Sequence, residues 1–160
     1  MDKDRLELLR KNENYIPPIH TLATDERKEF FSQFEKKTSI DSEQLLSGEL
    51  CHKILYQKNN ILPILHISEA NEQEILKFFL AEHDLHDEFV YLNYFYNTGD
   101  IDKIAAAELA NNFTYYWYPA VDDLLIISQS FDWIIGISHD GALYFQKYYS
   151  RQTTLGADNE

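Results

Sequence analysis

The fold of this chain is decided near its end, by the stretch FDWIIGISHDGALYFQKYY at residues 131–149. Two runs rich in β-branched and aromatic residues, which favour strands, flank Asp140-Gly141. Both residues of this dipeptide tolerate positive φ, so it predicts a two-residue type I′ turn between two antiparallel strands. In the register of such a turn, Ile137 faces Tyr144 across the hairpin.

The second half of the chain reads mostly as strands, and the first half as helices. Short runs of β-branched and aromatic residues predict strands over 89–96, 114–118, 123–128, 131–138 and 142–149. Helical spacing and capping residues predict helices over 4–11, 24–37 and 68–82, one across Leu45-Leu46, and one that begins at Asp100 and ends near residue 110. Residues 50–56 fit either type, and Pro63 predicts an edge strand over 61–67.

These elements predict an α+β fold, with an antiparallel sheet whose C-terminal β-hairpins pack against N-terminal helices. We expect the helices on one face of the sheet. Residues 1–150 form one expected domain, and the polar segment 151–160 is expected to be a flexible tail. Particular side chains follow from the same patterns: Thr24 as an N-cap, Ile75, Phe78 and Phe79 as the inner face of their helix, and Ile101 and Ile104 on one side of theirs.

Composition limits the possible functions. The net charge of −13 repels nucleic-acid phosphates and anionic lipid heads, so neither is an expected partner. No apolar stretch approaches the roughly 20 residues that span a bilayer. Cys51 is the only cysteine, so an internal disulfide is impossible. We expect a soluble cytoplasmic protein without a membrane partner.

The acidic residues are unevenly placed. Between Lys77 and Lys147 a single base, Lys103, stands against eleven acids, in a stretch crowded with Tyr, Phe and Trp. Acid without compensating base, set among large amphipathic rings, indicates a surface that meets a positively charged protein. An alternative is that the acidity only keeps the protein soluble, and that helices on both faces of the sheet cover the aromatic side chains.

Few residues point to catalysis. His83 and His86 lie three apart among carboxylates and suggest a metal-dependent hydrolase as an alternative function, but they straddle an expected helix end, so we expect no metal. Ser138 and His139 point to opposite faces of a strand and cannot pair. Phosphate-binding loops, paired cysteines and zinc signatures are missing from the sequence. We therefore expect no cofactor and no enzymatic activity.

Six residues are the expected contacts with the partner. The carboxylates supply charge, and the two rings supply anchors because a strand over 114–118 would turn them away from the core. The six are Asp122, Asp123, Asp132, Asp140, Tyr115 and Trp117.

The segments Tyr116–Pro119, Asp122–Leu124, Asp132–Ile134 and Ser138–Gly141 resemble the C-terminal hairpins of small acidic bacterial proteins. Immunity proteins of bacterial toxin–immunity pairs, including contact-dependent inhibition systems, are similar in size, charge and aromatic content. The chain is also similar to an adaptor superfamily named after yeast cell-wall regulators, although it lacks the expected Gly-rich loop. The first resemblance implies a protein that neutralises a basic toxin, typically a nuclease, by occluding its active cleft. A regulatory or adaptor domain that binds an endogenous protein is the other interpretation.

Overall fold

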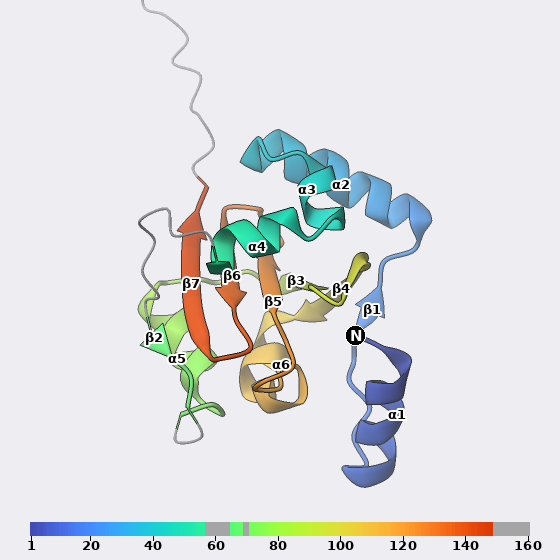
Figure 1. The fold of residues 1–160 in the computed structure, drawn as a ribbon, viewed down its shortest axis with the longest axis vertical. Coiled ribbons are helices and arrows are strands. Elements are labelled where there is room, and N and C mark those ends of the chain that lie inside the picture. The colour runs from blue at the N-terminus through green and yellow to red at the C-terminus, as the bar shows by residue number, and fades with distance from the viewer. Residues whose placement is uncertain (57–64, 69–70, 149–160) are drawn as a thin grey trace, which may run out of the picture.

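The computed structural model describes residues 1–56, 65–68 and 71–148 (Figure 1). Part of the expected edge strand, residues 61–64, and the expected tail at 151–160 lie outside these ranges. Among the described residues, none of the helices combines the length and the apolar composition needed to cross a bilayer.

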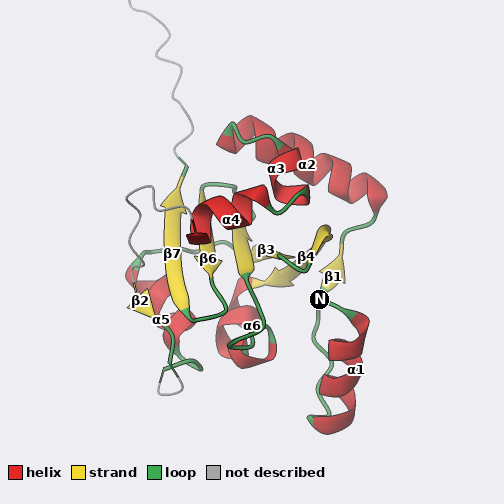
Figure 2. Cartoon of the chain, in the orientation of Figure 1, coloured by secondary structure: helices red, strands yellow, loops and turns green. Residues whose placement is uncertain are grey.

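One antiparallel sheet organises the described chain, and it confirms the predicted α+β class (Figure 2). Its strand order is β1-β4-β3-β5-β6-β7-β2, so the two short strands β1 and β2 form the edges. The strands are β1 (His20–Thr21), β2 (Leu65–His66), β3 (Phe89–Tyr94), β4 (Asn97–Ala105), β5 (Leu124–Ser128), β6 (Trp133–Ile137) and β7 (Ala142–Lys147).

Helices cover both faces of the sheet, so the expectation of a single covered face is wrong. The strand β5 shows why: all five of its residues are buried, Leu124 and Ile126 in one hydrophobic cluster and Leu125 and Ile127 in the other. The first cluster includes residues of α1 (Lys3–Asn12), α5 (Ile75–Glu82) and α6 (Ala106–Asn111). The second includes residues of α2 (Thr24–Thr38), α3 (Ser42–Leu46) and α4 (Glu49–Tyr56), which lie together above the sheet in Figure 1.

Local signals place the starts of α1, α2 and α3 to within about one residue. Asp2 caps α1 by accepting a hydrogen bond from the Arg5 N–H (2.8 Å), and Asp41 caps α3 by accepting one from the Glu43 N–H (2.9 Å). For α2 the cap is Ala23 and not Thr24, because the Glu26 carboxylate reaches back to the Ala23 N–H at 2.8 Å.

The helix α5 begins later than expected, at Ile75, and only Phe78 of its three expected inner residues points away from the core. Leu76 and Phe79 are buried, whereas Phe78, expected to point inward, is 65% exposed. Leu76 and Phe79 are three positions apart, so they lie on the same face of the helix, and this face meets the sheet. Phe78 lies on another face of the helix.

The expected helix from Asp100 is a strand as far as Ala105, and only α6 after it is helical. Ile101 and Ile104 belong to opposite hydrophobic clusters, as strand alternation requires for an odd and an even position. Their three-residue spacing fits a helix equally well. Pairing of β4 with both β3 and β1 decides between the two.

The expected strand over 114–118 is also wrong. Phe113–Tyr115 form a 3₁₀ turn, and the rings of Phe113 and Trp117 stack at 5.8 Å, as a helical turn allows. Tyr116 and Trp117 are both buried, at 0% and 3% exposure, so alternation does not turn Trp117 outward.

The C-terminal hairpin is present, but its turn differs from the prediction. Ile137 pairs with Leu143, one residue short of the expected register, and the Ser138 N–H donates to the Ala142 carbonyl at 3.0 Å. The loop therefore has three residues, of which only Gly141 has positive φ, at +88°. This glycine also permits the edge strand to dock, because a Cβ there would lie 2.6 Å from the Ile67 carbonyl oxygen.

Candidate functional site

The six expected contact residues do not form one surface. Asp122 and Trp117 lie in the interior, at 0% and 3% exposure, which contradicts their assignment as partner contacts. Tyr115 is half-buried and stacks on Tyr15 with ring centroids 4.4 Å apart. The remaining three are divided: the half-buried Asp123 and the exposed Asp140 lie by the hairpin loop, and the exposed Asp132 lies at the other end of β6.

Asp122 holds the first helix onto the sheet. Its Oδ2 accepts hydrogen bonds from Arg5 Nη1 at 2.6 Å and from the Tyr118 N–H at 2.8 Å. The Arg5 guanidinium lies 3.7 Å above the Tyr118 ring, and the Trp117 indole N–H donates to the Asp122 carbonyl at 2.9 Å. The Asp122 carboxylate is therefore structural, because the cation that it pairs with, Arg5, is a buried residue of the same chain.

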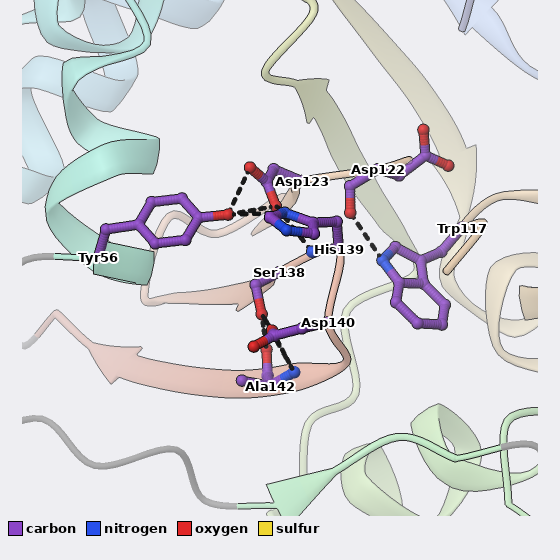
Figure 3. A network of polar contacts seen from close by, with 8 residues as sticks. All are labelled: Tyr56, Trp117, Asp122, Asp123, Ser138, His139, Asp140 and Ala142. Atoms are coloured by element: carbon purple, nitrogen blue, oxygen red, sulfur yellow. Dashed lines mark hydrogen bonds and ion pairs between the residues drawn. The ribbon is translucent and has the colours of Figure 1, made fainter. Parts of the chain in front are cut away.

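Asp123 joins a polar network beside the hairpin loop, shown in Figure 3. Its carboxylate accepts from the Tyr56 hydroxyl at 2.6 Å and 2.7 Å, and from the His139 backbone N–H at 2.7 Å. The His139 Nδ1 lies 3.0 Å from both the carboxylate and the Tyr56 oxygen. Burial, and then the bond to Asp123, raise the pKa of Tyr56 far above its usual value.

This network is unsuited to nucleophilic chemistry. A tyrosine with a raised pKa stays protonated and is a poor nucleophile. The Ser138 hydroxyl bonds to Asp140 and to the Ala142 N–H, not to His139. Its bond to Asp140 is the main reason that the pKa of that carboxyl is lowered. The sequence offers no local signal for Tyr56, because it comes from α4, 67 residues before Asp123.

A groove of about 780 Å³ lies at the opposite end of β6 and β7. Three segments form it: residues 83–87 after α5, the turn with Ser130, Asp132 and Trp133, and the end of β7 with Lys147 and Tyr148. The groove brings Asp132 together with the acidic residues of segment 83–87. From the sequence alone, these acids are considered only as possible metal ligands.

Hydrogen bonds tie the three segments of the groove together. Asp87 accepts from the Ser130 N–H and from the Trp133 indole N–H, both at 2.9 Å. The Tyr148 N–H donates to the Asp132 carbonyl at 2.7 Å. Because Asp87 is engaged on both oxygens, the groove has a fixed wall that includes the edge of a tryptophan.

The two histidines of the groove have separate partners. The His83 ring packs between Phe79 and Phe145, with centroids 4.3 Å and 5.1 Å away. His86 Nε2 lies 2.5 Å from an oxygen of Asp84. Within the part of the chain that the structure describes, no three His, Cys, Asp or Glu side chains are grouped so that they could hold a metal ion.

The acids of the groove outnumber its bases. Asp84 and Asp132 are exposed, and so are the neighbouring Glu82 and Glu88. Across the described residues, none of these four carboxylates has a Lys or Arg ion pair. Lys147 is the one Lys or Arg among the lining residues. The sequence signal for this groove is the segment 82–88, which has four acids in seven residues and no Lys or Arg.

Comparisons with protein-family models, with curated proteins and with solved structures return no match to this chain. The geometry and charge of its two polar surfaces are therefore the basis on which a function can be proposed.

Proposed function

We propose that this protein is an immunity protein that binds a basic bacterial toxin, for example a nuclease, and blocks its active cleft. The observation that carries the proposal is the groove at residues 83–87, 130–133 and 147–148, whose exposed carboxylates have no Lys or Arg partner in the described structure. A basic toxin surface would supply the missing counter-charges. The resemblance of the hairpin segments to immunity proteins also favours this function.

The proposed contact surface differs from the one that the sequence alone favours. Asp122 and Trp117 are excluded because they are interior. Asp132 is retained, and Asp84 and Glu88 join it. Surplus charge at such a surface accelerates encounter with a partner of opposite charge.

The test is to co-express the chain with the product of a toxin gene that neighbours its own, and to measure both growth and complex formation. We expect growth to be restored and a one-to-one complex to be recovered. A genuine neighbouring toxin that is neither bound nor neutralised would refute the proposal. A complex without growth rescue would instead indicate an adaptor role.

Charge reversal locates the surface in the same assay. Asp132→Lys should slow association with the toxin, because its carboxylate lies in the groove. The matched control is Glu29→Lys, an equal charge change at an exposed position in the middle of α2. Equal slowing by both variants would show that net charge, and not this groove, attracts the toxin.

A further inference from the structure

We infer that the groove receives an arginine side chain of the partner, whose guanidinium pairs with Asp84 and Asp132 and lies against the rings of Tyr148 and His86. The inference rests on the proposed function only for the identity of the protein that supplies the arginine. Its physical basis is the size of the groove, the availability of its carboxylates and the flatness of its rings.

The size fits a side chain with its flanking backbone. The groove encloses about 780 Å³, within the roughly 300–1,000 Å³ typical of pockets that bind small ligands. Its three segments are held by the hydrogen bonds of Asp87 and of the Tyr148 N–H, so the cavity exists before any partner arrives. A preformed cavity binds with a smaller ordering cost.

Two carboxylates are available to a cation. Asp87 uses both oxygens on Ser130 and Trp133. The Asp84 side chain, by contrast, is 89% exposed, and its one ion pair among the described residues is with the exposed His86. The Asp132 side chain forms no hydrogen bond or ion pair with any described residue. The groove therefore presents negative charge that the rest of the described chain leaves unneutralised.

The rings favour a guanidinium over an ammonium. His86 is exposed and Tyr148 is half-buried, so their rings are accessible from the cavity, whereas Trp133 is 4% exposed and belongs to its floor. A guanidinium is planar, stacks on such rings and pairs with carboxylates through a fork of N–H donors, whereas an ammonium is compact and strongly hydrated. Lys147 is a cation at the same site, with its Nζ 5.8 Å from the centre of the Phe145 ring. It opposes an incoming cation, so removing its charge should strengthen binding.

The two tryptophans of the chain allow a direct test in the full-length protein. The indole N–H of Trp133 donates to Asp87 in the groove, whereas that of Trp117 donates to a buried carbonyl and serves as an internal control. A ¹⁵N-labelled sample is titrated with acetyl-Gly-Arg-Gly-amide and followed by NMR. The same peptide with lysine, and with citrulline as an uncharged isostere, completes the series.

We expect the Arg peptide to shift the Trp133 signal saturably and to leave Trp117 unchanged. The Lys peptide should bind more weakly, and the citrulline peptide should leave the signal in place. Combining Asp84→Asn with Asp132→Asn should weaken the Arg peptide about tenfold, as for two partly exposed ion pairs. Asparagine suits position 84, where φ is +56°. Lys147→Gln should tighten binding severalfold.

The matched control combines Asp4→Asn with Glu29→Gln, two exposed acids on other helices, and should leave the affinity unchanged. A silent Trp133 signal, equal responses to arginine and citrulline, or an unaffected groove double variant would overturn the inference. The proposed function fails separately, when the toxin is not neutralised although the Arg peptide still shifts Trp133. Conversely, a toxin bound equally by the wild type and the groove double variant overturns only the arginine site.

Discussion

At Asp122 a single carboxylate holds the first helix onto the sheet, because it pairs with a guanidinium that is itself buried, with Arg5 only 6% exposed. Removing one member of such a pair leaves the other charged and without compensation. We predict that Asp122→Ala lowers the free energy of unfolding by about 3–5 kcal/mol, measured by urea denaturation. The double variant Arg5→Met with Asp122→Leu should recover much of this loss. A loss below about 1 kcal/mol for Asp122→Ala would show that Arg5 finds another partner.

Also at the scale of one residue, Tyr15 makes the free energy of unfolding depend on pH in the alkaline range. Burial, and then its hydrogen bond to Glu108, raise the pKa of Tyr15 to about 12, against about 10 for a tyrosine in an unfolded chain. The stabilisation is therefore complete below about pH 10, declines as the unfolded state loses its proton, and is gone above about pH 12.

We predict that Tyr15→Phe makes the fall of the urea midpoint between about pH 10 and pH 12 shallower, because one linked proton is removed. Part of the fall should remain, since burial also raises the pKa of Tyr96 and Tyr148 to about 12. Identical pH profiles for the variant and the wild type would contradict the role of Tyr15.

Between elements, the packing of α4 on the sheet depends on Gly136 in β6. A Cβ at this position would lie 2.6 Å from Ile54 Cγ2 and 2.8 Å from Leu55 Cδ2, both in α4. We predict that Gly136→Ala forces α4 outward and costs about 1–3 kcal/mol of unfolding free energy. Gly99→Ala in β4 is the matched control, because nothing lies within 4 Å of its Cβ. Thermal denaturation of both variants decides: equal effects would mean that contact with α4 is unimportant.

For the whole molecule, the net charge of −13 and the uncompensated acids of the groove predict a salt-dependent encounter with a basic partner. If the toxin is bound as proposed, its association rate should fall by about tenfold or more between roughly 50 and 500 mM salt, while dissociation changes less. Stopped-flow mixing measures both rates. An association rate that ignores salt would contradict the electrostatic part of the proposal.

Elements with strong local signals were predicted correctly. A cap at Asp41 places α3, and runs such as Leu124–Ser128 and Trp133–Ile137 place β5 and β6. These signals are local because a cap or a β-branched run acts on its own backbone. Where two periods fit equally well, as for residues 101–105, the neighbouring strands made the choice.

The sequence by itself determined the α+β class, the C-terminal hairpin and the excess of acid in the second half of the chain. Only the tertiary structure decided which acids face solvent: it buried Asp122 against Arg5, bonded Asp123 to Tyr56, and left Asp132 in a groove with Asp84. The physical reason is that burial and pairing depend on which distant segments meet. Arg5 lies 117 residues from Asp122, and no local pattern contains that contact.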